Sequence, residues 1–166
     1  MIPWELNIHD DNAAVREAIR RMYRVITDDA SDGYMKANQS TEQHLRYHIQ
    51  GARGEIAVSQ YLFMPWTGSG VDGRDRKDVG DRIEVRTSAR ATGLIVKVLE
   101  QKKNQPSTPY VLVHSLAGPK MALIGWTTLG DALEVGEFYE QRDVAFCRVP
   151  KQNLRPMSEL KCLIRS

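Results

Sequence analysis

The chain has few cysteines and no long apolar run, and each absence excludes a class of protein. Only Cys147 and Cys162 are cysteine, and no Cys-x-x-Cys spacing occurs. This argues against a disulfide framework or a cysteine-based zinc site, and predicts free thiols in a reducing compartment. No apolar run approaches the roughly 18 residues that cross a membrane, and the N-terminus lacks the pattern of a signal peptide. We therefore expect an intracellular, cytoplasmic protein with no membrane partner.

Charge of one sign is also scarce, because 23 lysine and arginine residues nearly balance 21 aspartate and glutamate residues, for a net charge of +2. This mild basicity is compatible with nucleic-acid binding but is too weak to indicate it by itself. Hydrophobic residues make up 42% and charged residues 27%, as in an ordinary globular protein. With no repeat or linker in 166 residues, we expect one domain over residues 1–166.

The first half of the chain carries the signals of two helices. A first helix is predicted from Asp10 or Asp11 to about residue 27. Ser40, with Gln43 three residues later, forms a capping-box pattern for a second helix, which Pro65 ends. Their predicted inward-facing residues are Val15, Ile19, Met22 and Ile26, then Leu45, Ile49, Ala52, Ile56 and Phe63.

The second half changes to short apolar runs bounded by glycine, proline or polar turns, as strands are. Strands are predicted over 82–87, 94–99, 110–114, 121–126 and 144–149. A short helix is expected within 127–140 and a closing helix over 157–164. Helices followed by a mostly antiparallel sheet indicate an α+β domain.

One short segment after a glycine-rich loop combines charged and apolar residues in a regular pattern. Glu84 and Arg86 lie two residues apart, so they share one face of a predicted strand. Val79, Ile83 and Val85 would form the opposite, buried face if the chain turns at the intervening glycine. The segment therefore predicts a hairpin with one charged and one apolar side.

The position of Asp78 depends on the length of that turn. A two-residue loop, 80–81, would send its carboxylate to the face of Ile83. A three-residue loop, 80–82, pairs Asp78 with Glu84 and places both carboxylates together. The second register separates apolar from charged side chains, so we favour it.

Two neighbouring carboxylates repel each other, which destabilises a strand pair unless a cation offsets them. Such a conflict with local stability is typical of a functional site. Mg²⁺ fits best, because it prefers hard oxygen ligands, often one or two carboxylates with water and phosphate completing the shell. A bound Mg²⁺ can activate water and neutralise charge on a phosphodiester.

The segment resembles the PD-(D/E)XK nuclease superfamily, including its small phage-borne and bacterial members. The matching residues are Gly54, Glu55 and Ala57 on a helix, Asp78-Val-Gly, Ile83-Glu84-Val85-Arg86-Thr87, Gly125-Trp126 and the strand ending at Pro150. The resemblance implies a central mixed sheet flanked by helices. It also implies Asp78, Glu84 and the Val85 carbonyl as ligands of Mg²⁺ or Mn²⁺, with Glu55 as a further carboxylate at the edge of the site.

Arg86 departs from this family, which normally has lysine there. Lysine can help to deprotonate a water, whereas arginine stays protonated and can only orient groups and stabilise charge. Arginine also binds phosphate well through its forked guanidinium. Arg86 therefore fits a slow or modified nuclease, and equally a protein that binds nucleic acid without cutting it. Lys97 on the next strand is a possible substitute base.

Several other residues have a functional and an ordinary reading. His44 and His48 are spaced as zinc ligands can be, but without the glutamate of a zinc-protease motif they are read as a solvent-facing pair. His48 is also a candidate phosphate contact.

The Gly-x-Gly-x-x-Gly pattern at 68–73 does not follow a strand, so it indicates a loop. The basic residues that follow, Arg74, Arg76 and Lys77, are candidate contacts to a phosphate backbone. Trp66 and Trp126 could stack on bases but are more often core residues.

These patterns together favour a metal-dependent endonuclease acting on DNA. The alternative is a nuclease-fold protein without catalysis that binds nucleic acid or a partner protein. The choice between DNA and RNA stays open, as does the pairing of two copies into a homodimer.

Overall fold

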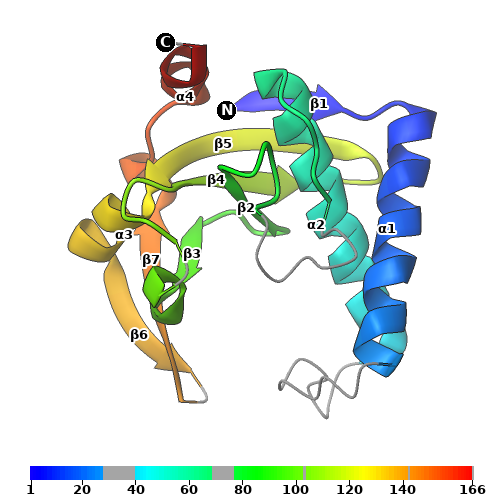
Figure 1. Cartoon of the computed structure of the whole chain (residues 1–166), viewed down its shortest axis with the longest axis horizontal. Helices are drawn as coiled ribbons and strands as arrows, with labels where there is room; N and C mark the ends of the chain where they lie inside the picture. The colour runs from blue at the N-terminus through cyan, green and yellow to red at the C-terminus, as the bar shows by residue number, and fades with distance from the viewer. Residues whose placement is uncertain (28–39, 69–76, 103, 142, 166) are drawn as a thin grey trace.

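The computed structural model describes residues 1–27, 40–68, 77–102, 104–141 and 143–165 (Figure 1). Helix α1 (Ile8–Thr27) begins where the Asn7 side chain accepts hydrogen bonds from the backbone N–H groups of His9 and Asp10, 2.9 and 3.0 Å away. The start predicted at Asp10 or Asp11 is therefore late, because Asn7 supplies the cap. Helix α2 (Thr41–Leu62) has the predicted capping box at Ser40 and Gln43.

The two helices pack through small and charged residues more than through large apolar ones. In α1 the buried residues include Ala14, Glu17 and Ala18, while the predicted core residue Ile19 is 54% exposed. Phe63, predicted as the last core residue of α2, is 77% exposed because the chain turns there into a left-handed conformation (φ 57°). Periodicity placed the helices correctly but not every inward-facing residue.

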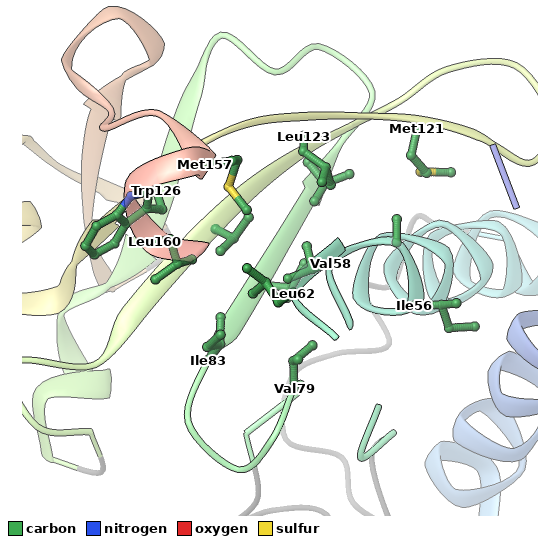
Figure 2. Close-up of a cluster of buried hydrophobic side chains, with 14 of the residues drawn as sticks. Ile56, Val58, Leu62, Val79, Ile83, Met121, Leu123, Trp126, Met157 and Leu160 are labelled. Atoms are coloured by element: carbon green, nitrogen blue, oxygen red, sulfur yellow. The ribbon is translucent and has the colours of Figure 1, made fainter. Parts of the chain in front are cut away.

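Sheet one has the strand order β1-β5-β4-β2. Its strands are β1 (Ile2–Glu5), β5 (Lys120–Thr128), β4 (Pro109–Ser115) and β2 (Glu84–Ser88). Only β2 and β4 pair in parallel, and β2 forms an edge of the sheet. Helix α2 packs against one face, where Val58 and Leu62 share a buried cluster with Val79, Ile83 and Leu123 (Figure 2).

A second sheet covers the opposite face, with the order β3-β7-β6. Its strands are β3 (Gly93–Lys97), β7 (Val144–Pro150) and β6 (Glu137–Gln141), all antiparallel. Leu94 and Val149 of this sheet pack against Tyr110 and Leu112 of β4 in a buried cluster. Leu129 of helix α3 (Leu129–Val135) belongs to the same cluster. The remaining elements are the 3₁₀ turns η1 (Val98–Lys102) and η2 (Lys151–Asn153) and the closing helix α4 (Met157–Arg165).

The predicted α+β class is confirmed, but the strands are divided between two sheets. The layer behind sheet one is therefore mainly a second sheet instead of the flanking helices that the family resemblance implies (Figure 1). Strands β1 and β6 were not predicted. Strand β6 is exposed along its whole length, so it has no alternation of buried and polar residues for a sequence pattern to reveal. Within the described residues, no helix combines the length and apolarity needed to span a membrane.

Candidate active site

The hairpin before β2 has the predicted three-residue loop. Val79 and Ile83 form an antiparallel bridge and exchange two backbone hydrogen bonds, 3.2 and 3.1 Å long. Gly80 and Asp81 take the positive φ values of 58° and 54° that this turn requires. The register places Asp78 opposite Glu84, as the separation of apolar and charged residues predicted.

Asp78 is fixed at the free edge of β2. Its Oδ2 atom accepts a 2.7 Å hydrogen bond from the backbone N–H of Val85, which points away from β4. Because N–H and C=O of one strand residue point to the same side, the Val85 carbonyl lies at this edge as well. Two side-chain carboxylates and one backbone carbonyl, the three expected metal ligands, therefore meet at the start of β2.

Helix α2 brings Glu55 to the other side of Asp78. Gly54 permits this approach, because a Cβ atom at that position would overlap the hydroxyl of Thr87 on β2. Glu55 itself is 5% exposed and receives two hydrogen bonds from the Arg21 guanidinium, 2.9 and 2.7 Å long. Trp66 Nε1 donates a third, at 3.0 Å. Glu55 thus lies beside the site but is held by a cation of α1.

The charge of Arg21 is shared between two buried carboxylates. Its Nε atom donates to Glu17 at 3.2 Å, one turn earlier on α1. Burial works against the pKa of Arg21, but hydrogen bonds to Glu55 and the charges of Glu55 and Glu17 outweigh burial and raise that pKa. Sequence reasoning missed both Glu17 and Arg21, since only the packing of α1 against α2 joins them to Glu55.

The ionised form of Asp78 is destabilised by its surroundings. Burial and the negative charges of Glu55 and Glu84 raise its pKa to about 8, although the Val85 hydrogen bond and the charge of Arg86 act in the opposite direction. A carboxyl group so destabilised in its ionised form is a position where a bound cation would be strongly favoured.

Arg86 lies on the charged face of β2 with three acceptors. Its Nη1 atom is 3.3 Å from Glu84 Oε2 and 3.3 Å from the Val85 carbonyl oxygen. Its Nη2 atom is 2.7 Å from Glu100 Oε2, and the guanidinium lies over the Tyr110 ring, 5.2 Å from the centroid. Burial by itself would lower the pKa of Arg86. The negative charges of Glu100, Glu84 and Asp78 outweigh burial and raise this pKa, so the guanidinium stays charged.

Three polar residues around Arg86 were not predicted as site residues. Tyr110 donates its hydroxyl hydrogen to Glu100 Oε2 at 2.6 Å, and Asn104 Nδ2 contacts the Tyr110 oxygen at 2.6 Å and Glu84 Oε1 at 3.3 Å. Burial and the neighbouring Glu100 raise the pKa of Tyr110. Glu100 and Asn104 belong to the link between β3 and β4, and no spacing in the sequence relates them to Glu84.

The oxygen atoms at the edge of β2 suit a hard divalent cation. Mg²⁺ is often held by one or two carboxylates with a carbonyl or water completing its ligands, which is the chemistry that Asp78, Glu84 and Val85 present. In the described part of the chain, no three side chains of His, Cys, Asp or Glu are gathered as a metal-binding group. A cation here would therefore depend on two carboxylates and the backbone oxygen.

No model of a protein family, no curated protein and no solved structure matches this chain. The chemistry of the residues is what indicates a function.

The other predicted residues lie in different surroundings. His44 is buried, not solvent-facing as predicted, and its Nε2 atom has no hydrogen-bond partner among the described residues. Burial, then the charges of Arg21 and His44, lower the pKa of the half-buried His48. Lys97 lies on β3, in the second sheet. Arg74 and Arg76 lie outside the described residues, as does most of the 68–73 pattern.

The two tryptophans considered as base-stacking residues each have a hydrogen-bond partner in the fold. Trp126 is 2% exposed and donates its indole N–H to the backbone oxygen of Pro156 at 3.2 Å. Trp66 donates to Glu55, as described above. The ordinary reading as core residues therefore describes Trp126, whereas Trp66 belongs to the border of the candidate site.

Proposed function

We propose that the protein is a Mg²⁺- or Mn²⁺-dependent endonuclease of the PD-(D/E)XK type that hydrolyses phosphodiester bonds in DNA inside a cell. The observation that carries this proposal is the 80–82 loop. It sets Asp78 opposite Glu84 beside the Val85 carbonyl, at an open strand edge. Such a set of oxygen atoms next to a permanently charged arginine fits a phosphodiester with a divalent ion.

Each residue then has a defined part. Asp78, Glu84 and the Val85 carbonyl would hold the ion, which when bound lowers the pKa of a water and neutralises charge on the phosphate. Arg86 keeps its proton, so it orients the phosphate and stabilises charge there but does not act as a base. Glu55, fixed by Arg21, adds negative potential beside Asp78. An ionised Asp78 is therefore more favourable with a bound cation than without one.

Cleavage assays test this proposal directly. Supercoiled plasmid with Mg²⁺ or Mn²⁺ should be nicked, or linearised if two copies act together. Asp78→Asn and Glu84→Gln should each lower the rate by about 10²–10³-fold, because each removes a charged ligand of the ion that would stabilise the transition state. Glu137→Gln changes an exposed carboxylate on β6, away from the hairpin, and should cut at the wild-type rate. Cleavage that survives both site substitutions, or a wild type inert on DNA and RNA, would contradict the proposal.

A second candidate function is nucleic-acid or partner-protein binding without cleavage. The observation that favours it is the Nη1 atom of Arg86, which contacts both Glu84 and the Val85 carbonyl where a metal ion would otherwise bind. This candidate predicts DNA binding in EDTA and no cleavage even by Arg86→Lys. Gain of cleavage in Arg86→Lys would instead show that the site is complete for catalysis except for a lysine at position 86.

The expected DNA contact at Lys77 lines a groove next to the hairpin. The groove has a volume of about 440 Å³ and lies between the hairpin and α4, where Lys77, Arg82, Gln105 and Ser107 are among the lining residues. Within the described residues, neither Lys77 nor Arg82 takes part in an ion pair. Both belong to the hairpin that carries Asp78 and Glu84, so a DNA backbone bound in this groove would contact that hairpin.

Charge reversal tests the groove as a DNA contact. Arg82→Glu should weaken binding of a labelled 20-nucleotide DNA, single-stranded or duplex, in EDTA, and lower the slope of log affinity against log salt by about one. Arg46→Glu is the matched control, because Arg46 is exposed on α2 and pairs only with the exposed Glu42 in the described structure. Equal affinities for the two variants would exclude the groove.

A further inference from the structure

Arg86 divides its two terminal nitrogen atoms between different partners. Nη2 makes the short contact, 2.7 Å to Glu100 Oε2, which is the distance of a strong charge-assisted hydrogen bond. Nη1 makes the two long contacts, 3.3 Å each, to Glu84 and to the Val85 carbonyl. Arg86 can therefore release both expected metal ligands while keeping its strongest partner.

Glu100 is itself held in place by Tyr110. The same Oε2 atom that binds Arg86 accepts the Tyr110 hydroxyl hydrogen at 2.6 Å. Tyr110 is fully buried in the core between the two sheets, and its ring lies under the Arg86 guanidinium. One rigid side chain thus fixes both members of the Arg86–Glu100 pair.

An arginine beside a metal site creates a specific difficulty. Its positive charge competes with a divalent cation for the same carboxylate, and the two cations repel each other at short distance. A pairing of Arg86 with Glu84 alone would therefore weaken metal binding. A second, better-placed carboxylate changes this balance, because it neutralises Arg86 without using a metal ligand.

We propose that Glu100 is a positioning residue that draws Arg86 away from Glu84 and so leaves Glu84 and the Val85 carbonyl available to a divalent cation. This inference rests on the proposed function, since it concerns the same metal ligands. Once Nη1 is released, it can donate a hydrogen bond to a phosphate oxygen while Nη2 stays on Glu100. Glu100 is in this way the residue that makes arginine usable at a position where the resembled family has lysine.

A double-mutant cycle on Mg²⁺ affinity tests the inference without any nuclease assay. Isothermal titration with Mg²⁺ is compared for wild type, Glu100→Gln, Arg86→Met and the double variant. Glu100→Gln keeps an oxygen acceptor for Tyr110 but loses the charge that holds Arg86, so its Mg²⁺ affinity should fall by about 10-fold. With Arg86→Met as the background, the same substitution should change the affinity less than about twofold, because no arginine competes for Glu84.

The controls separate this inference from the proposed function. Glu137→Gln removes one exposed carboxylate on β6 and should leave the Mg²⁺ affinity unchanged. Wild-type protein that binds no Mg²⁺ would overturn the metal site, and with it the proposed function. Wild-type protein that binds Mg²⁺, with Glu100→Gln equal to wild type or equally weakened in both backgrounds, would overturn only the role of Glu100.

Discussion

At pH 8, Asp78→Asn is expected to raise the free energy of unfolding by on the order of 2–4 kcal/mol, equivalent to a melting temperature roughly 5–15 °C higher. The physical reason is the environment of the carboxyl group. Burial and the charges of Glu55 and Glu84 raise the pKa of Asp78 to about 8. An asparagine still accepts the Val85 N–H hydrogen bond but carries no charge, so it removes the repulsion and keeps the geometry.

The effect should depend on pH with a definite sign. Below pH 4 the Asp78 carboxyl is protonated in the folded and the unfolded chain, so its raised pKa costs nothing. Between pH 4 and pH 8 the folded chain binds more protons at this group than the unfolded chain does, and the wild-type stability falls as pH rises. Above pH 8 the full cost is present. The advantage of Asp78→Asn should therefore be near zero at pH 4 and largest above pH 8.

Thermal melts at several pH values, with and without Mg²⁺, measure this prediction. Addition of Mg²⁺ at 100 times its dissociation constant should stabilise the wild type by about 2.7 kcal/mol and Asp78→Asn much less. Asp81→Asn, the same substitution at an exposed position of the hairpin, should show no comparable pH dependence. A constant difference between wild type and Asp78→Asn from pH 4 to pH 8 would show that Asp78 is not the strained group.

Arg21→Met is expected to lower the free energy of unfolding by about 3–5 kcal/mol. Arg21 is the cation between Glu17 and Glu55, and the three side chains are only 14%, 8% and 6% exposed. Methionine preserves much of the side-chain volume but removes the cation that Glu55 and Glu17 share, while Glu17 keeps its ion pair with Arg20 at 3.5 Å. The loss comes from those carboxylates more than from the missing arginine. Urea unfolding at pH 7 measures it.

A control and a rescue define the origin of that loss. Arg46→Met breaks an exposed ion pair with Glu42 and should cost less than about 1 kcal/mol. The double variant Arg21→Met with Glu55→Gln should recover part of the stability, because glutamine can still accept the Trp66 hydrogen bond without a charge. An equal, small effect of Arg21→Met and Arg46→Met would mean that the buried network contributes little.

The hairpin at the site could be predicted because its information is local. Apolar and charged residues separate cleanly only in the register with Val79 opposite Ile83, and the structure adopts it. The start of α2 was predictable for the same reason, since Ser40 and Gln43 form their capping box within one turn. Local pattern therefore located Asp78, Glu84 and Arg86 on one hairpin.

The partners of these residues could not be predicted, because they come from distant elements. Arg21 reaches Glu55 across 34 positions, and Glu100 reaches Arg86 from a 3₁₀ turn after another strand. His44 was assigned to the solvent because nothing in its own helix shows that its side is covered. Long-range packing determines which charged side chains pair, and no periodicity or spacing within a single sequence predicts such contacts.

Asp78 also has a consequence for how the molecule avoids other copies of itself. Strand β2 is one of the two edges of sheet one, and an edge strand with free N–H groups is a template for pairing with another chain. The Asp78 carboxyl group accepts the hydrogen bond of the outward-pointing Val85 N–H, so this N–H is not available to a further strand. The same side chain that destabilises the folded state thus makes pairing of this edge with a strand of another copy less favourable.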